Sequence, residues 1–574
     1  MLHGSFLVQH QRMLKPIFIF VGLSVCVFPC GADESWNRFV SDFLEQSFKA
    51  TPQIGIYVGR HEYDGQFQDF SAKGLKQESQ RLKVALARAR AFEESKLSSQ
   101  EKFERSYLMA EVRRELFWLD VADFPHHNPA YYFDNGLDPS IYTNRPYASV
   151  DVRLKAYVKY LRGIPKVLGQ MRANLKTPLS PSYIKFGESA FEGFAEYYLN
   201  DGKKAFSAAQ DTRSKKEMDD AAKTAAGAMR DTVKWLKAQT KSAKPNFALG
   251  AQRLSQMLKD TEMVDVPLER LHAIGEADLK RNQKALAEAC SQYAPHKSIE
   301  DCVAKMGADK PKGGAVEAAR AQLSNLKAFI RKHDLVSIPS NEDALVAEAP
   351  TYNRQNAAYI DIVGPYEKNL PSVYNIAPPD PAWKPEVRDA FLPGKAVLLF
   401  TSVHEVWPGH FLQFLHAKQS KSMFGRVYVG YVFAEGWAHY GEEMMWEAGL
   451  SGGDPEMHVG QLSDALLRDC RFLSAIGLHT GKMTEDESKA LFKRECHQDE
   501  GNAIQQAARG TYDPAYLNYT LGKLMIRKLR EDWTAKRGGR KAWKEFHDQF
   551  LSYGGPPIPL VRQQMLGGDA KAVF

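Results

Sequence analysis

Residues 400–414 read FTSVHEVWPGHFLQF, and this stretch decides how the rest of the sequence is interpreted. His404 and Glu405 resemble the start of an HExxH metal-binding helix, but the second histidine, His410, follows six residues after the first instead of four. On an unbroken helix, residues four apart lie about 40° from each other around the axis, whereas residues six apart lie about 120° from each other. The two histidines can therefore share one metal ion only if the helix breaks between them.

Pro408 and Gly409 supply the residues for such a break. Proline lacks a backbone N–H and its ring clashes with the preceding turn, and glycine adopts backbone conformations that other residues avoid. The proline also pushes Trp407 away from helical geometry. The sequence therefore predicts a helix that breaks or bulges between Trp407 and His410. A single regular helix over 400–414 would instead favour a buried helix with two incidental histidines.

The residue types around the break suit zinc chemistry. Catalytic zinc sites use three protein ligands and keep the fourth position for water. His404 and His410 would be two of these ligands, and Glu405 would be the general base that accepts a proton from the water. The third ligand must come from another part of the chain.

The third ligand is expected in FAEGWAHYGEEMMWEAG, residues 433–449. This segment has a strong helical pattern, with Glu435, His439 and Glu442 on one face. Gly436 and Trp437 are typical of close packing, which favours Glu435 as the third ligand over an ordinary exposed acid. Two alternatives stay open for Glu442, which could be the ligand or could orient a ligand histidine from behind.

The two motifs resemble those of a large bacterial family known as a domain of unknown function. Its members carry HExxPGHxxQ and EGWAxYxE, which match HEVWPGHFLQ at 404–413 and EGWAHYGE at 435–442. The family is regarded as helical zinc metallopeptidases, similar to thermolysin-type gluzincins and Taq-type carboxypeptidases, and the resemblance covers at least 350–530. It implies one zinc ion on His404, His410 and Glu435, with Glu405 as general base.

Two later segments also resemble the family. RDCRFLSAIGLHTGKMT, residues 468–484, supplies Arg471 and His479, and ARGTYDPAYLNYTLGKLMIRKLR, residues 508–530, supplies Arg509, Tyr519, Gly522 and Lys523. This sequence departs from the family pattern at Ala475, where an Asp is usual, and at His439, where an apolar residue is common. His439 would then be either a substrate contact or a tolerated histidine.

These later residues suit the hydrolysis of an amide. A tetrahedral intermediate needs hydrogen-bond donors near its oxyanion, and His479 or Tyr519 could supply one. Arg509 could bind the terminal carboxylate of a peptide through two parallel hydrogen bonds, and Lys523 is a second candidate for substrate binding. The structural alternatives are that Tyr519 belongs to the core and that Arg509 only caps a helix or forms an ion pair.

The N-terminus has the pattern of a secretory signal. Residues 1–32 contain no acidic residue, and Arg12 and Lys15 precede the apolar run PIFIFVGLSVCVF. We expect cleavage near Ala32 and a periplasmic or secreted protein. An uncleaved anchor is the alternative, whereas a lipid attachment is disfavoured by the bulky residues in VFPC. No other stretch approaches the length of a membrane span.

Cysteine usage agrees with export. Two of the six cysteines lie in the signal segment, and the remaining four form the local pairs Cys290/Cys302 and Cys470/Cys496. An even number in an exported protein permits two disulfides, although three pairings are possible and buried free thiols are an alternative.

The fold class expected from the sequence is mainly α. Segments such as 80–95 and 316–333 carry apolar residues three and four apart on a charged background. AAYIDIVG at 357–364 and PSVYNIAP at 371–378 are the best strand candidates, and they predict a short hairpin before a Pro-rich loop. We expect 33–574 to be one large helical, zincin-like (gluzincin-type) domain, in which two lobes could flank an active-site cleft beside the hairpin.

Composition narrows the function classes. The chain is 44% hydrophobic with a mild net charge of +7, and it lacks the dense basic tracts of nucleic-acid-binding proteins. We expect an exported zinc metallopeptidase that hydrolyses short peptides and pairs them with an edge strand of the hairpin. The alternatives are a non-catalytic envelope protein with a structural or degenerate metal site, and a zinc amidase acting on a non-peptide amide. The sequence leaves the oligomeric state open.

Overall fold

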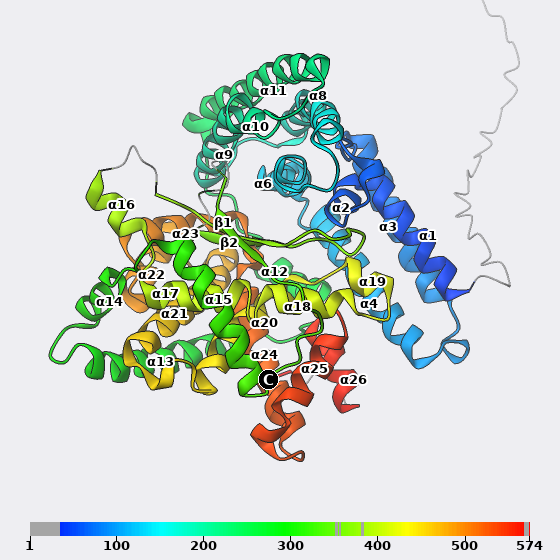
Figure 1. Ribbon diagram of the computed structural model, residues 1–574. Helices are drawn as coiled ribbons and strands as arrows, with labels where there is room; N and C mark the ends of the chain where they lie inside the picture. Colours follow the sequence, from blue (N-terminus) through cyan, green and yellow to red (C-terminus); the bar gives the residue numbers. More distant parts are fainter. Residues whose placement is uncertain (1–34, 351–353, 355–356, 380–383, 568–572) are drawn as a thin grey trace, which may run out of the picture.

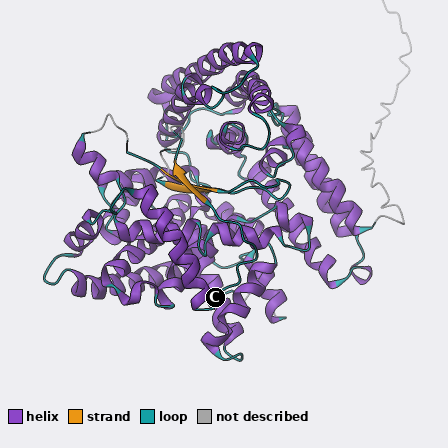
Figure 2. Cartoon of the chain, viewed as in Figure 1, coloured by secondary structure: helices purple, strands orange, loops and turns teal. Residues whose placement is uncertain are grey.

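A computed structural model describes residues 35–350, 354, 357–379, 384–567 and 573–574 of the chain. Helices dominate these residues and surround one small sheet (Figure 1, Figure 2), which confirms a mainly helical fold. The expected signal segment at 1–32 and the middle of the expected Pro-rich loop lie outside the described residues. Among the residues described, no helix combines the length and apolar character needed to cross a membrane.

The first half of the chain forms the helices at one end of the molecule (Figure 1). They are α1 (Trp36–Ala50), α2 (Pro52–Tyr57), α3 (Ala72–Ala91), α4 (Ser99–Leu116), α5 (Phe124–His127), α6 (Ala130–Asp134), α7 (Ser140–Asn144), α8 (Val150–Asn174), α9 (Pro181–Leu199), α10 (Asp201–Lys204) and α11 (Thr212–Gln239). The middle of the chain adds α12 (Ala251–Glu262), α13 (Leu268–Tyr293), α14 (Ile299–Ala308), α15 (Ala315–Lys332) and α16 (Pro385–Phe391).

The last part of the chain contains the two motif regions. Its helices are α17 (Lys395–Glu405), α18 (His410–Lys418), α19 (Met423–Val427), α20 (Tyr431–Glu447), α21 (Pro455–Thr480), α22 (Glu485–Cys496), α23 (Glu500–Tyr512), α24 (Asn518–Thr534), α25 (Trp543–Ser552) and α26 (Ile558–Leu566).

Local sequence signals explain where these helices begin and which face they bury. The side chain of Ser35 accepts a hydrogen bond from the first turn of α1, and Phe39 and Phe43 then fall on its buried face, one turn apart. At α4, Ser98 and Glu101 form a capping box that satisfies backbone donors in both directions. Capping and apolar periodicity therefore agree along these segments.

The sheet has three strands in the order β1-β3-β2, with β1 Leu345–Glu348, β2 Ala358–Asp361 and β3 Val373–Ile376. β2 and β3 pair antiparallel, with Ala358 opposite Ile376, which confirms the predicted hairpin. β1 pairs parallel with β3 on the other side and was not predicted. β1 contacts α15 and β2 contacts α17, so the hairpin lies beside the helix that carries His404.

Two buried apolar clusters form the interior. One is built by α1–α11 and also contains Phe424, Tyr428 and Leu560 from the second half of the chain. The other extends from α12 to the C-terminus, contains residues of the sheet, and also includes Phe117 and Ala122 from the first half of the chain. Direct contacts also join the two halves of the chain, such as the hydrogen bond that the Tyr107 hydroxyl donates to the Tyr428 carbonyl. The helices that carry the motifs belong mostly to the second cluster.

Two disulfides close the local pairs suggested by the sequence. Cys290–Cys302 joins α13 to α14, and Cys470–Cys496 joins α21 to α22. The Cα atoms of each pair lie 5.8 and 6.4 Å apart, within the range that disulfides span. The alternative of buried free thiols is therefore not what the structure contains.

Candidate metal centre

The predicted break is present. α17 ends at Glu405, α18 begins at His410, and the four residues between them are not helical. The chain turns so tightly that the N–H of Gly409 donates to the carbonyl of Val403 at 2.9 Å. A Cβ on Gly409 would lie 1.7 Å from the carbonyl oxygen of His404, so only glycine fits at this point.

Trp437 holds the break against α20. Its indole N–H donates to the carbonyl of Pro408 at 2.8 Å, and the side chain is fully buried. The hydrogen bond satisfies a backbone acceptor that the interrupted helix leaves free. The Trp of the EGWA motif therefore fixes the position of the loop between the two histidines.

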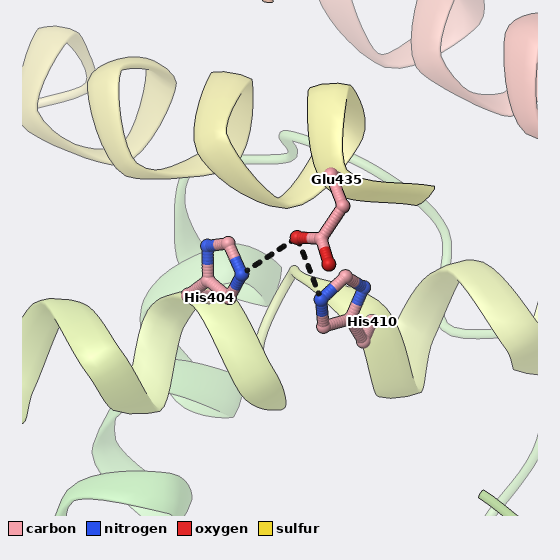
Figure 3. Close-up of side chains that lie close together, drawn as sticks. All are labelled: His404, His410 and Glu435. Atoms are coloured by element: carbon pink, nitrogen blue, oxygen red, sulfur yellow. Dashed lines mark ion pairs between the residues drawn. The ribbon is translucent and has the colours of Figure 1, made fainter. Parts of the chain in front are cut away.

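The break brings His404 and His410 to the same carboxylate. Oε2 of Glu435 lies 3.2 Å from Nε2 of His404 and 3.4 Å from Nε2 of His410 (Figure 3). One ligand atom from each of these three residues falls within 4.8 Å of the others. The three residues come from α17, α18 and α20, so the site is assembled by the packing of three helices.

This cluster fits a zinc ion by its donor set and by one unmet acceptor. Two imidazole nitrogens and one carboxylate oxygen are the ligands of many catalytic zinc sites. Oε2 of Glu435 is buried, and its contacts with both histidines are close enough for ion pairs but not aligned as hydrogen bonds. A buried acceptor without an aligned donor is uncommon in folded proteins, and a cation at this point would satisfy it.

Glu442 lies on the opposite side of His404 from Glu435. Its Oε1 is 2.7 Å from Nδ1 of His404, and Nη2 of Arg468 is 3.1 Å from the same oxygen. An acceptor at Nδ1 fixes the imidazole with Nε2 facing Glu435, which is how outer carboxylates orient metal-binding histidines. Of the two glutamates considered from the sequence, Glu435 lies at the Nε2 atoms of both histidines, and Glu442 lies at Nδ1 of His404, on the other side of that ring.

Charges around His404 favour a cation. Burial lowers the pKa of His404, but its contacts with Glu435 and Glu442 outweigh burial and raise the pKa to about 9. Burial raises the pKa of Glu442, but the charge of Arg468 and the contacts with the histidines outweigh burial and hold that pKa far below its usual range. Two ionised carboxylates therefore face one imidazole.

Glu405 is the last residue of α17 and lies next to His404 in the chain. It is 8% exposed, and its carboxylate has no hydrogen bond or ion pair within the described residues. Its charge reaches Tyr374 on β3, whose pKa is raised mainly by burial and further by Glu405. A carboxylate with no donor of its own in that part of the chain is suited to accept a proton.

Tyr519 lies beside the same cluster. Its ring is stacked on that of His404, with 6.2 Å between centroids and 19° between planes. α24 reaches this position because α20 and α24 meet at two glycines, where a Cβ on Gly436 would lie 2.5 Å from Cα of Gly522. Burial and the charge of Glu435 raise the pKa of Tyr519, so the phenol stays protonated and can donate a hydrogen bond.

The structure does not bring His479 to the cluster. Its Nε2 faces the carbonyl of Gly510 at 2.7 Å, and its Nδ1 accepts a hydrogen bond from the N–H of Leu249 at 3.4 Å. Burial lowers the pKa of His479 to about 4, so the ring is neutral and both nitrogens are engaged. It links α21 to its neighbours and has no nitrogen left for an oxyanion.

Lys523 and His439 are enclosed by protein. The Lys523 ammonium is fully buried and lies 2.5 Å from Asp278 and 3.7 Å from Glu443, in a network of ion pairs. His439 is also fully buried, with Nδ1 3.4 Å from Glu442, and burial lowers its pKa to about 3. Neither side chain reaches a surface on which a substrate could lie.

Arg509 approaches Tyr519 but is paired. Its guanidinium lies 2.9 Å from the carboxylate of Asp513, the residue that follows the end of α23, and donates to the hydroxyl of Tyr431 at 3.0 Å. Its Cζ is 5.9 Å from the centroid of the Tyr519 ring. Arg468, which supports Glu442, was not assigned a role from the sequence; its place one helical turn before Arg471 was the available signal.

The fold is shared with two solved structures. A candidate lipoprotein of unknown function from Shewanella oneidensis is 23% identical, with a TM-score of 0.76 over 93% of this chain and 100% of its own. A candidate lipoprotein from Colwellia psychrerythraea is 16% identical, with a TM-score of 0.77 over 92% of this chain and 98% of its own. At these identities the likeness establishes the fold alone.

The comparison with curated proteins gave no match. The family described as a bacterial protein of unknown function (DUF885) matches residues 52–565, and the chain belongs to this family.

Proposed function

We propose that this chain is an exported zinc-dependent peptidase that hydrolyses short peptides. The observation that carries the proposal is the convergence of His404, His410 and Glu435 on one point. Glu405, next to His404 in the chain, has a carboxylate without an ion pair among the described residues. A structural zinc site has four protein ligands and no use for a free acid beside it, whereas a catalytic site has three and needs a base.

Each neighbouring residue has a task in amide hydrolysis. A zinc ion in this cluster would polarise the substrate carbonyl and lower the pKa of an adjacent water to about 7. Glu405 would accept the proton of the attacking water and pass it to the leaving amine. Tyr519 would donate a hydrogen bond to the developing oxyanion, and Glu442 would keep Nε2 of His404 directed at Glu435.

The sheet suggests how a peptide would be held. β2 pairs with β3 on one side, and no strand pairs with its other side within the described part of the chain. The strand contacts α17, which carries His404 and Glu405. An extended peptide could add to this edge by backbone hydrogen bonds, which would align it beside the metal centre.

The decisive experiment combines zinc content with peptide hydrolysis. We expect one zinc ion per chain and hydrolysis of short peptides by the zinc-loaded protein. Glu405→Gln should keep the zinc and lose activity by about 100-fold or more, because it removes only the base. Glu269→Gln, an exposed acid on α13, is the control and should behave as the wild type.

Three results would count against the proposal. Hydrolysis that survives Glu405→Gln would refute the assigned base. One tightly bound zinc without hydrolysis of any peptide would favour a structural metal site in a non-catalytic envelope protein. Cleavage confined to non-peptide amides would favour an amidase that uses the same residues.

A further inference from the structure

Three arginines surround Tyr519 next to the candidate metal centre. The Cζ atoms of Arg468, Arg471 and Arg509 lie 5.8, 4.9 and 5.9 Å from the centroid of its ring. The first two are one turn apart on α21, and the third lies on α23. Such a concentration of positive charge beside a cation site requires negative partners.

Two of these arginines have carboxylates of their own. Arg468 lies 3.1 Å from Glu442 and 3.7 Å from Asp464. Arg509 lies 2.9 Å from Asp513. Their charges are therefore balanced within the protein, and neither is free to bind the carboxylate of a substrate without losing a partner.

Arg471 differs from both. Its Nε donates to the neutral amide oxygen of Gln506 at 2.8 Å, and no carboxylate pairs with it within the residues that the structure describes. Only 8% of its surface is exposed. Burial lowers its pKa, and the nearby charge of Arg509 lowers it further. A buried guanidinium without a counter-ion is costly, so this position favours an anion.

We propose that Arg471 binds the free C-terminal carboxylate of the peptide substrate. The inference rests on the proposed peptidase function and adds to it the substrate class, peptides cleaved near their C-terminus. The planar guanidinium matches a carboxylate through two parallel hydrogen bonds, and the terminal nitrogens of Arg471 have no partner in the described part of the chain. The sequence suggested Arg509 for this role. Because Arg509 is paired with Asp513, it would attract the carboxylate only through its charge and would not bind it directly.

The geometry limits how far from the terminus cleavage occurs. The Tyr519 ring centroid lies 6.2 Å from the His404 ring and 4.9 Å from Cζ of Arg471. The imidazole and the guanidinium therefore cannot be farther apart than these two distances together. An extended residue spans about 3.5 Å, so roughly one to three residues separate the scissile bond from the carboxylate.

The test compares two peptides of the same sequence, one with a free C-terminal carboxylate and one with a C-terminal amide. We expect the zinc-loaded wild type to cleave the acid with a kcat/KM about 100-fold above that of the amide. Arg471→Gln should lower kcat/KM for the acid by a similar factor and that for the amide much less, so that the preference for the acid disappears, and Arg471→Lys should recover part of the preference.

Binding provides a readout that does not depend on turnover. In the Glu405→Gln background, the zinc-loaded protein should bind a fluorescent peptide acid about 100-fold more tightly than its amide, and Arg471→Gln should abolish the preference. A third peptide, which has a C-terminal amide and a glutamate near that end, tests whether the site prefers a terminal carboxylate to a side-chain carboxylate. The comparison of acid and amide in the wild-type protein remains informative even if Arg471→Gln fails to fold.

The outcomes separate this inference from the proposed function. Equal cleavage of acid and amide overturns the carboxylate site and leaves the peptidase intact. Preferential binding of the acid with no hydrolysis of either peptide supports the site and refutes the peptidase. A preference that persists in folded Arg471→Gln overturns the assignment to this residue, and equal acceptance of the glutamate-containing amide overturns the terminal assignment.

Discussion

Replacing Gly409 by alanine tests the break between the two histidines most directly. The added Cβ would lie 1.7 Å from the carbonyl oxygen of His404 and 2.5 Å from that of Val403. Carbon–oxygen contacts are seldom closer than about 3.3 Å, so the backbone on either side of the break must separate by about 1.5 Å. Both groups are backbone atoms, so no flexible side chain can move aside.

The displacement predicts losses in stability and in metal binding. Overpacking costs about 1–3 kcal/mol, and a contact this short between backbone atoms belongs at or above the upper end. A displacement of about 1 Å in a functional site costs about 100-fold. We therefore expect Gly409→Ala to lower the free energy of unfolding in urea by about 3 kcal/mol and zinc affinity, measured against a competing chelator, by about 100-fold.

Gly441→Ala is the matched control. Its Cβ would make only an ordinary contact, 3.6 Å from Cγ of Pro408, although it lies on α20 beside the same loop. Alanine in a helix interior is favoured over glycine by about 1 kcal/mol, so this variant should be at least as stable as the wild type. A Gly409→Ala protein with unchanged zinc affinity and unchanged stability would refute the proposed reason for the glycine.

Two further predictions concern ion pairs outside the candidate metal centre. Lys523→Met removes the fully buried cation paired with Asp278, which keeps Arg281 at 2.8 Å and Arg527 at 3.8 Å. It should lower the free energy of unfolding by about 3 kcal/mol in urea titrations, with the KM for peptides unchanged; a raised KM would restore a role in substrate binding. Burial lowers the pKa of His61, but hydrogen bonds with Asp64 and Glu367 outweigh burial and raise it to about 9. Because the unfolded value is about 6.5, this stabilisation, roughly 3 kcal/mol at most, is complete below pH 6.5 and lost as pH rises through 9. His61→Gln should abolish that part of the pH dependence, and a wild type equally stable at pH 6 and pH 10 would contradict it.

The features that the sequence could predict depend on local chemistry. Pro408 and Gly409 restrict their own backbone, so the break follows from two adjacent residues. The hairpin was predictable because two segments rich in β-branched and aromatic residues lie close together in the chain. The ion pair of Arg509 with Asp513 could also have been predicted, since the two are four residues apart at the end of a helix.

The features that escaped prediction depend on distant residues. β1 has only four residues, LVAE, in an alanine-rich stretch, and its strand character comes from pairing with β3. Lys523 is paired with Asp278, which lies 245 residues earlier, so its burial could not be foreseen from a motif on α24. Arg471 has no carboxylate partner among the described residues, and this depends on how all the surrounding helices pack and not on a local motif.

The contact between Gly436 and Gly522 limits how this protein could diverge. A Cβ on Gly522 would lie 2.3 Å from the carbonyl oxygen of Val432, and a Cβ on Gly436 would meet Gly522 itself. The two positions occupy one shared space, and neither residue has an atom that a compensating mutation could remove. Replacing either glycine by a larger residue would push α20 and α24 apart, and this would move Tyr519 away from Glu435. The distance between the two helices therefore depends on both positions staying glycine, and no single substitution can change it without a clash.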